Sequence, residues 1–368
     1  MSFDKKSLVL FMPSIEGGGV EKNLFLVANH LAKKIKKIKL ITYEKTFKYF
    51  LNKNVEVLYF KRKSSNESKY FKYAMCIWLL IKFYFKNKNI LVFSFQANIY
   101  CLILSKIFNF DVIIRSNSSP TGWSQGFFKN IVFKIFFKFA KSIIVNSFEF
   151  KKLLDKKFNI NSTVIYNPLN KEEVIKKSKE QIGKKFFNGK SNINFINIAR
   201  FTDQKDQLTM LNALNNLKNK INFELLIMGY GVNKNILQNF IKKNNLKKKI
   251  KIIGFQKNPY KFLSKADILI SSSIYEGLPN VLIESLASKK FVISSDCPTG
   301  PREILKNGKY GYLFKTKSVE DLSKKILKFV KTSNKSKNLI KNKAYDSLSR
   351  FDFKKNSDKY FKLISKHL

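Results

Sequence analysis

Histidine and arginine are both scarce in this chain. It has two histidines, His30 and His367, and only five arginines among 71 basic residues, although its net charge is +46. Arginine is preferred for bidentate recognition of bases and phosphates, so its scarcity argues against sequence-specific DNA reading. The abundance of Asn, Ile and Phe is what an AT-rich coding sequence produces regardless of function. We therefore predict no specific nucleic-acid partner, while lysine point charges still allow attraction to an anionic membrane surface.

Cysteine is also rare, and the spacing of the cysteines predicts neither a metal site nor a redox site. Cys76, Cys101 and Cys297 are far apart and odd in number, without metal or redox spacing. They are typical of ordinary thiols in a reducing cytosol. Residues 1–6 lead directly into a strand-like run at 7–12, so no secretory signal is expected. These observations predict a cytoplasmic protein.

The order of apolar segments predicts an α/β fold. The chain has 368 residues, enough for two domains, and a hydrophobic fraction of 44% excludes a mainly disordered protein. Short apolar runs alternate with longer amphipathic ones, for example helices at 20–34 and 70–84, which indicates parallel sheets. The expected strands are 8–12, 39–42, 56–59, 90–94, 112–115, 142–145 and 163–165, then 194–199, 223–228, 250–254, 268–271 and 292–294.

Two Rossmann-like domains are the simplest account of this series. We predict an N-terminal domain at 1–170, a linker at 171–190, a C-terminal domain at 191–350 and a final helix at 351–368 that packs back on the first domain. The linker prediction depends on a charged stretch containing Gly183 and Gly189. Ligands of such domains lie at the carboxyl ends of the strands, so the default site is a cleft between the two domains.

The most informative segment is 273–287, SIYEGLPNVLIESLA. Pro279 suits the first position of a helix, because its fixed φ is helical and its missing N–H would lack a partner there. The preceding turn would aim backbone N–H groups at one positively polarised point. Glu276 lies on that turn and Glu284 about one helical turn inside. An anion cradle beside two carboxylates suits a sugar nucleotide, whose diphosphate takes the N–H groups and whose hydroxyls take the carboxylates.

Two further motifs follow the first strand of each domain. Gly17–Gly19 would let the backbone approach a ligand closely at the start of a helix, although a plain strand-to-helix turn is the alternative. Arg200 and Lys205 lie five residues apart at a strand-to-helix junction, where both can point at one diphosphate. Lys205 alone would mean little in so lysine-rich a chain, but arginine is rare and Arg200 ends an apolar strand.

Two glycine-containing loops are less specific. Gly229-Tyr-Gly231 resembles the start of a dinucleotide fingerprint without its third glycine, so a tight turn is the better interpretation. The segment 296–303, DCPTGPRE, precedes a short helix for which Pro301 is an apt first residue. A rigid connector and a direct ligand role are equally favoured for it.

The segment 127–141, FFKNIVFKIFFKFAK, places lysines along one side and aromatic residues around the rest. It suits a membrane surface, with its lysines on lipid headgroups. A buried α/β helix with one wet face is equally compatible. The apolar run at 73–85 is too short to span a bilayer.

Together these motifs resemble the retaining GT-B glycosyltransferases of family four. Glu276 and Glu284 match that family's E-x7-E motif, Arg200 and Lys205 its Arg-x4-Lys pair, and Gly17–Gly19 its glycine loop. The resemblance covers nearly the whole chain. The segments YEGLPNVLIE and DCPTGPREIL look closest to members that build bacterial surface polysaccharides and lipid-linked oligosaccharides.

The resemblance implies a donor site and a reaction. Arg200 and Lys205 would bind the diphosphate and stabilise the leaving nucleotide. Glu276 would hold sugar hydroxyls and Glu284 the ribose hydroxyls. The remaining donor contacts would come from Gly18, Gly19, Gly277, Leu278, Pro279, Asn280 and Val281. The donor would be a nucleotide sugar, most often UDP-linked, and the reaction a front-side displacement with retention. Because cations and a helix end balance the diphosphate, no metal or other cofactor is required.

The acceptor half departs from the family pattern. Many relatives carry a histidine after the strand that corresponds to 112–115, where this chain has Arg115-Ser116-Asn117. Either Ser116 or Asn117 would then contact the sugar, or the local chemistry would differ, and Arg115 could instead meet an anionic acceptor such as a pyrophosphate. His30 falls inside a helix, where a packed or solvated histidine is expected. The resemblance implies a glycan or polyprenyl-linked acceptor, and hence peripheral association with the inner face of the cytoplasmic membrane.

Two other classes compete with this prediction. A sugar-nucleotide epimerase can share the two-domain architecture, but it needs acid/base residues, commonly including a histidine. A non-enzymatic protein that binds membranes or nucleic acid through charge would have no use for Glu276 and Glu284.

Overall fold

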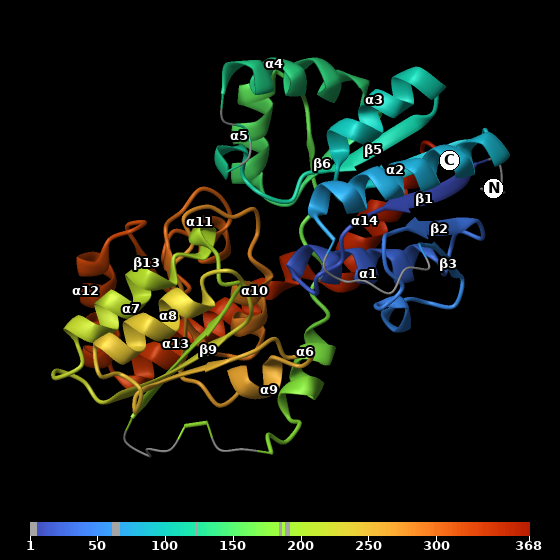
Figure 1. Ribbon diagram of the computed structural model, residues 1–368. Coiled ribbons are helices and arrows are strands. Elements are labelled where there is room, and N and C mark those ends of the chain that lie inside the picture. Colours follow the sequence, from blue (N-terminus) through green and yellow to red (C-terminus); the bar gives the residue numbers. More distant parts are fainter. Residues whose placement is uncertain (1–5, 61–66, 123, 125, 184–185, 188–191) are drawn as a thin grey trace. The chain divides into compact units, whose positions relative to one another are not determined.

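The computed structural model describes residues 6–60, 67–122, 124, 126–183, 186–187 and 192–368. It contains two compact units, one formed by residues 1–168 and 353–368 and the other by 169–352 (Figure 1). Each unit is a parallel sheet covered by helices. None of the helices in the described part of the chain is long and apolar enough to cross a membrane.

The first unit contains a seven-stranded parallel sheet in the order β3-β2-β1-β4-β5-β6-β7. Its strands are β1 (Ser7–Phe11), β2 (Ile38–Ile41), β3 (Val55–Leu58), β4 (Ile90–Ser94), β5 (Asp111–Arg115), β6 (Ser142–Val145) and β7 (Thr163–Val164). Its helices are α1 (Gly19–Leu31), α2 (Lys69–Lys86), α3 (Asn98–Phe108), α4 (Phe127–Phe136), α5 (Phe148–Phe158) and α14 (Phe353–Ser365).

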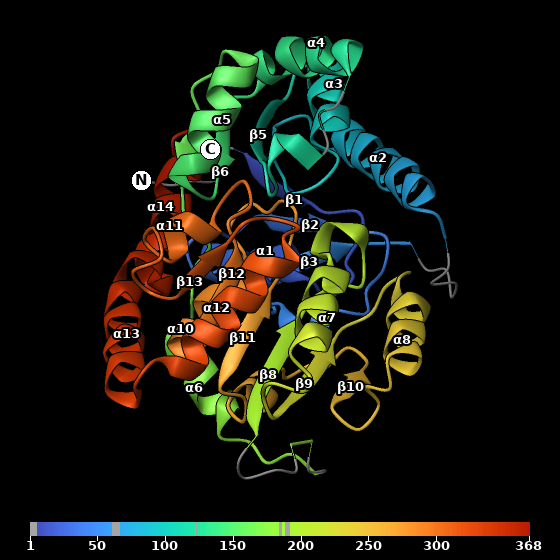
Figure 2. The same ribbon diagram turned by 90° about the vertical axis from the view of Figure 1, so that its left-hand side faces the viewer.

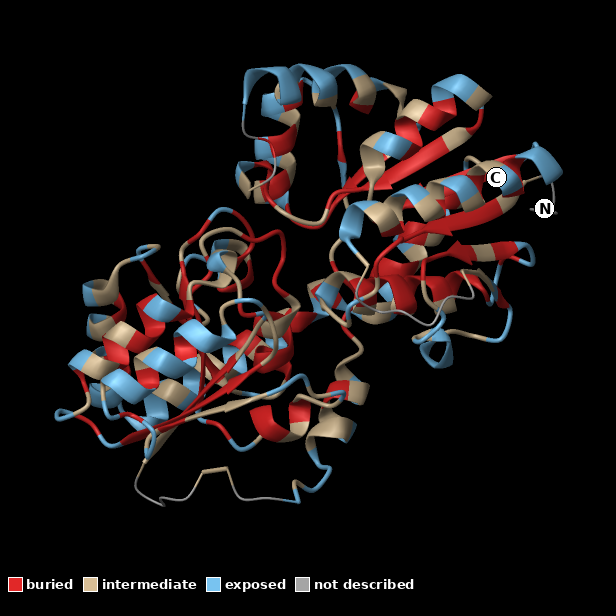
Figure 3. Ribbon diagram, viewed as in Figure 1, coloured by how far each residue is buried: buried red, intermediate tan, exposed pale blue. Residues whose placement is uncertain are grey.

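Both faces of this sheet are buried, which explains its almost continuously apolar strands. Successive side chains of a strand point to opposite faces. Val9 and Phe11 accordingly join one core, with α2, α3 and α5, while Leu8 and Leu10 join another, with α1 and α14. Figure 3 shows the buried strands between helices whose outer sides are exposed.

The C-terminal helix α14 belongs to the first unit, where it packs against α1. Tyr360 and Ile364 are fully buried there. His30 of α1 is 9% exposed and its Nε2 lies 2.8 Å from Oδ1 of Asp358. His30 is thus the packed histidine that its helical position predicts.

The second unit contains a six-stranded parallel sheet in the order β10-β9-β8-β11-β12-β13. Its strands are β8 (Ile193–Ile198), β9 (Phe223–Met228), β10 (Ile250–Ile253), β11 (Ile268–Ser271), β12 (Phe291–Ser295) and β13 (Tyr312–Phe314). Its helices are α6 (Lys171–Ser178), α7 (Gln207–Asn216), α8 (Lys234–Lys243), α9 (Tyr260–Leu263), α10 (Asn280–Ala287), α11 (Pro301–Ile304), α12 (Val319–Lys331) and α13 (Asn334–Asp346). Helices α7, α8 and α12 share the apolar core of one face (Figure 2).

The predicted linker needs a correction, because residues 171–178 form helix α6 of the second unit. Asn170 caps the helix, accepting a hydrogen bond from the N–H of Glu173, and α6 packs against α9 and α10. Acidic residues in the first turn and lysines in the last complement the helix dipole. Residues 184–185 and 188–190 of the predicted linker, including Gly189, lie outside the described residues.

Candidate active site

The carboxyl ends of β8 and β11 form the switch point of the second sheet. These strands pair in parallel, and the strand order reverses between them. Ligands of open α/β sheets bind in the crevice outside such a point. The loop after β8 carries Arg200 and Lys205, and the loop after β11 carries Glu276. The topology therefore brings together residues that are more than seventy positions apart in the sequence.

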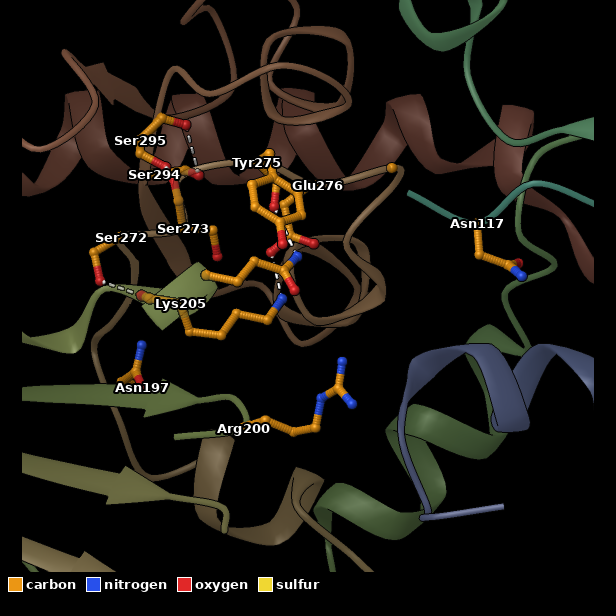
Figure 4. Close-up of polar contacts among 12 residues, drawn as sticks. Asn117, Asn197, Arg200, Lys205, Ser272, Ser273, Tyr275, Glu276, Ser294 and Ser295 are labelled. Carbon is orange, nitrogen blue, oxygen red and sulfur yellow. Dashed lines mark hydrogen bonds and ion pairs between the residues drawn. The ribbon is translucent and has the colours of Figure 1, made fainter. Parts of the chain in front are cut away.

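Lys205 and Glu276 form an ion pair at this edge (Figure 4). The Lys205 Nζ lies 2.5 Å from Oε1 of Glu276, and the two side chains are 18% and 9% exposed. Because both side chains are largely buried, each charge needs the other. Burying either one alone would cost free energy. A ligand at this pair would therefore meet the ammonium group of Lys205 on one side and the carboxylate oxygens of Glu276 on the other.

Backbone and side-chain hydrogen bonds join the two loops that carry this pair. The Ser272 hydroxyl donates to the carbonyl oxygen of Lys205 at 3.0 Å, and the N–H of Ile274 donates to that of Gln204 at 2.8 Å. The Gln204 amide in turn donates to the carbonyl oxygen of Tyr275 at 2.8 Å. These bonds fix the position of Lys205 relative to Glu276 before any ligand binds.

Arg200 is exposed at the end of β8 (Figure 4), and the glycine turn after β9 supports its loop. A Cβ on Gly231 would lie 2.3 Å from the carbonyl oxygen of Phe201, and a Cβ on Gly229 would lie 1.9 Å from that of Ala199. Both glycines have positive φ. The segment therefore forms a tight turn packed against the Arg200 loop, as predicted, and only glycine fits at either position.

The loop from Glu276 to Pro279 is held from behind by the segment after β12. The N–H of Glu276 donates to the carbonyl oxygen of Pro298 at 2.8 Å, and the Thr299 hydroxyl donates to those of Glu276 and Gly277 at 2.9 and 3.1 Å. A Cβ on Gly300, whose φ is +90°, would lie 2.4 Å from the Gly277 carbonyl oxygen. These contacts favour the connector interpretation of segment 296–303, and Pro301 begins α11 as predicted.

Pro279 needs a small correction. It precedes helix α10 as its N-cap, with ψ at 108°, and Asn280 is the first helical residue. The extended ψ is the reason, since a residue inside the helix has negative ψ. The eight-residue helix still presents its positively polarised end beside Glu276.

Glu284 lies on the second turn of α10 and is 9% exposed. The Tyr260 hydroxyl of α9 lies 3.2 Å from its Oε1. A buried carboxylate with a fixed orientation suits recognition of hydroxyl groups. Its two oxygens can accept more hydrogen bonds than the one that Tyr260 donates. Tyr260 and the serines after β11 were not predicted from the sequence. The run Ser271-Ser272-Ser273 at a strand end is the signal that would have indicated the serines.

The glycine loop of the first unit follows β1, beside the switch point between β1 and β4. Gly17 has a φ of +79° and Gly18 is the N-cap of α1. The Glu21 carboxylate turns back on this loop and accepts from the N–H of Glu16 at 3.3 Å. A Cβ on Gly18 would lie 2.8 Å from Oε2 of Glu21. Because a carboxylate stands at the helix start, this end of α1 favours hydroxyl groups over a phosphate.

Arg115 is not placed to meet a ligand in this structure. It is 1% exposed, its Nε donates to the Tyr360 hydroxyl at 2.9 Å, and its Nη2 donates to Oδ1 of Asn167 at 2.5 Å. The prediction that Arg115 meets an anionic acceptor is thus contradicted by its burial. The residue instead ties α14 and the end of the first unit to β5.

Asn117, which the sequence predicted as a sugar contact, lies in a group with three amide side chains that were not predicted. Gln96, Asn98, Asn117 and Asn146 follow β4, β5 and β6, so neighbouring strands bring them to one edge. The Asn117 Nδ2 donates to the carbonyl oxygen of Phe95 at 2.7 Å, whereas the buried Oδ1 atoms of Asn117 and Asn146 have no hydrogen-bond partner. Polar residues directly after three consecutive strands are the signal that would have indicated this group.

Comparisons with known proteins identify the family of this chain. Residues 177–345 match the family model described as glycosyl transferases group 1. An uncharacterized glycosyltransferase of Methanocaldococcus jannaschii is 34% identical over 309 residues, which cover 74% of this chain and 76% of that protein. A Campylobacter jejuni N-acetylgalactosamine-N,N'-diacetylbacillosaminyl-diphospho-undecaprenol 4-alpha-N-acetylgalactosaminyltransferase is 31% identical, over about half of each chain (51% and 49%).

Solved structures give the same fold. HepE of Anabaena, crystallised with UDP and glucose, superposes with a TM-score of 0.80 at 17% identity, covering 98% of this chain and all of that one (100%). The two Rossmann-like units are thus those of the GT-B fold. The chain belongs to the group 1 glycosyltransferases.

Proposed function

We propose that this enzyme is a retaining glycosyltransferase that moves a hexose or N-acetylhexosamine from a UDP-sugar to a glycan or polyprenyl-linked acceptor in surface polysaccharide synthesis. The observation that carries the proposal is the sheltered Lys205–Glu276 pair at the switch point, 2.5 Å between charged atoms, with Arg200 on the same sheet edge. A cation for a diphosphate and a carboxylate for sugar hydroxyls meet there at one place. The UDP and glucose bound to HepE support the choice of donor.

The chemistry divides among these residues. The bond from the anomeric carbon to the diphosphate breaks as the acceptor oxygen bonds to the same face of that carbon. Bond formation on the face of the leaving group retains the anomeric configuration, and the acceptor proton passes to the departing phosphate oxygen. Arg200, Lys205 and the amino end of α10 stabilise the negative charge that develops on the diphosphate. Glu276 orients the sugar and Glu284 the ribose.

This division of labour leaves no role that needs a metal ion. Two side-chain cations and a helix end supply the positive charge that a divalent ion supplies elsewhere. We therefore expect transfer to continue in the presence of excess EDTA.

The amide group of the first unit suits an uncharged sugar acceptor. The Asn117 and Asn146 Oδ1 atoms are buried acceptors without partners, and each can take a hydrogen bond from a hydroxyl group. The carboxylates of Glu16 and Glu21 in the neighbouring loop are further acceptors. Glycan hydroxyls satisfy such a surface better than a pyrophosphate does.

Peripheral association with the inner face of the cytoplasmic membrane is part of the proposal. Helix α4 has no buried residue, and Phe127 and Phe128 are 74% and 83% exposed beside Lys129. The other side of the segment packs on the first unit, where Phe133 and Phe136 contact the apolar core and Phe137 is 2% exposed, so features of both alternatives are present. Exposed aromatic rings beside lysines suit an anionic lipid surface. The Campylobacter relative acts, by its name, on a diphospho-undecaprenol-linked substrate.

The proposal is tested by variants that preserve shape at the donor site. Glu276→Gln keeps the side-chain volume but removes the charge that holds Lys205, and Arg200→Ala removes one diphosphate cation. We expect each to lower kcat by about a hundredfold or more, since each removes charge stabilisation used in the transition state. Transfer from UDP-sugars to a polyprenyl-diphosphate-linked glycan is measured with EDTA present, and proton NMR of the product reports the anomeric configuration.

Lys328→Gln is the matched control, because it removes one charge from α12, distant in sequence from the motif loops. Near-normal activity in Glu276→Gln and Arg200→Ala would contradict the site assignment. An inverted anomeric configuration would contradict retention, and isomerised UDP-sugar formed without acceptor would favour an epimerase.

A further inference from the structure

A second polar hollow lies at the opposite end of the second sheet. It has a volume of about 270 Å³ and is bounded by segments that precede β8, β11 and β12, together with α12 and α13. Arg200 and Glu276 instead follow the carboxyl ends of β8 and β11. The two sites are therefore separated by the length of the strands, and a ligand of the hollow does not overlap the donor.

Lysines dominate the lining. Lys289, Lys290, Lys337 and Lys341 are four of its twelve residues, whereas about one residue in five of the whole chain is basic. Asp267 is the single acidic residue of the lining. Its Oδ2 already accepts from the backbone N–H of Asn194 at 2.9 Å. The hollow is thus richer in positive charge than the composition alone predicts.

None of the four lysines forms an ion pair with a carboxylate of the described residues. Lys290 Nζ donates to the carbonyl oxygen of Ser264 at 2.7 Å, and Lys337 Nζ lies 4.2 Å from the centre of the Phe329 ring. These contacts orient the ammonium groups without forming an ion pair, and Asp267 balances only part of their charge. Burial lowers the pKa of Lys290 and of Lys337, Asp267 opposes that effect, and the charge of Lys341 adds to it.

The start of helix α13 adds to this positive potential. Asn334 is both the first residue of α13 and part of the lining. The amino end of a 13-residue helix carries partial positive charge and attracts anions. Lysines from two segments and a helix end thus face one volume, large enough for several phosphate groups.

We propose that this hollow is a second anion site, which binds a multiply charged phosphate independently of the donor site. Lysine is a regular phosphate ligand that acts as a point charge. The phosphate is either a free oligophosphate or the headgroup of an anionic lipid, and both present the same charged oxygens.

The test uses Lys337→Gln/Lys341→Gln in the full chain carrying Arg200→Ala and Lys205→Ala, which suppresses binding at the donor site. Lys328→Gln/Lys331→Gln is the matched control, because these lysines line an open hollow on α12. Tripolyphosphate affinity is measured by calorimetry and binding to phosphatidylglycerol vesicles by sedimentation, with circular dichroism as the check on folding.

We expect the Lys337/Lys341 double substitution to weaken tripolyphosphate binding on the order of tenfold, because it removes two partly exposed charge contacts. The control double substitution should weaken it by less than about twofold. Loss of tripolyphosphate binding alone identifies a free oligophosphate, and an equal loss of vesicle binding identifies a lipid headgroup. Equal effects of both pairs of changes, or no effect of either, would overturn the proposal. Failure of the glycosyltransferase proposal would leave these measurements unchanged, because they require no transfer.

Discussion

At the scale of single residues, burial decides which groups of this protein can react. Cys297 precedes Pro298, whose carbonyl oxygen accepts from the N–H of Glu276, yet burial raises the pKa of its thiol to about 12, and the charge of Glu276 acts in the same direction. Burial likewise raises the pKa of Cys76 and of Cys101 to about 12. Only the thiolate is nucleophilic, so a raised pKa protects all three groups near neutral pH.

We therefore predict that the native protein resists alkylation at pH 8. With a pKa of about 12, roughly one thiol in ten thousand is ionised at that pH. Iodoacetamide should leave the folded protein unmodified, whereas the three cysteines should all react in guanidinium chloride, where their pKa values return to normal. Intact-mass measurement distinguishes the two results. Rapid modification of the native chain would show that one of these thiols is more accessible than the structure implies.

The sequence allowed the approach of Lys205 and Glu276 to be predicted, but not the burial of Arg115. Lys205 and Glu276 occur in motifs whose spacing is informative, and the structure brings them into contact. Arg115 follows a strand in the same way, yet Tyr360, 245 positions away, accepts its hydrogen bond. A partner on a distant C-terminal helix leaves no local pattern, so burial of this arginine could not be inferred.

At the scale of elements, strands buried on both faces were the most predictable part. The ranges 90–94, 142–145, 223–228 and 268–271 agree with β4, β6, β9 and β11 residue for residue. Continuous apolar runs of this kind identify strands of parallel sheets. Strand β13 was missed because it has only three residues, lies at the sheet edge and gives no run to detect. Helix α6 was missed because its charged residues and the glycines that follow resemble a linker.

The glycine turn after β9 provides a test at this scale. Gly231 has a φ of +148°, and an added Cβ would lie 2.3 Å from the Phe201 carbonyl oxygen, one residue from Arg200. We predict that Gly231→Ala displaces the Arg200 loop, weakens UDP binding by about tenfold or more and costs about 1–3 kcal/mol of stability. Calorimetric titration with UDP and a thermal melt measure the two effects.

Gly183→Ala is the control for this change, because nothing lies within 4 Å of its added Cβ. It should leave UDP affinity and the melting temperature almost unchanged. If Gly231→Ala bound UDP as tightly as the unmodified protein, the loop would not depend on this turn.

At the scale of the whole molecule, each unit repeats one plan and the loops differ. Both sheets place their switch point beside the first strand of the unit, yet one edge is lined by Arg200 and Lys205 and the other by amides and carboxylates. The two α/β sheets followed from periodicity, whereas the GT-B fold was implied by the family resemblance. The acceptor edge did not, because its residues lie singly on separate loops and no spacing links them.

The net charge of +46 acts at this scale too, since it draws the whole protein to anionic surfaces irrespective of any one site. Charge alone does not orient the molecule. An oriented contact needs apolar groups that enter the lipid, and α4 presents them, with Ile131, Val132 and Ile135 exposed along with Phe127 and Phe128.

We predict that Phe127→Ser/Phe128→Ser lowers binding to phosphatidylglycerol vesicles by about tenfold, since burial of an aromatic side chain contributes about 1.5–3 kcal/mol when complete and less at an interface. Ile236→Ser/Leu339→Ser removes two exposed apolar side chains of the second unit and should change binding less than twofold. Vesicle sedimentation at low and high salt separates the two contributions, because salt screens the lysines but not the apolar contact. Equal binding by both variants would mean that charge alone attaches the protein, and α4 would then have no place in membrane association.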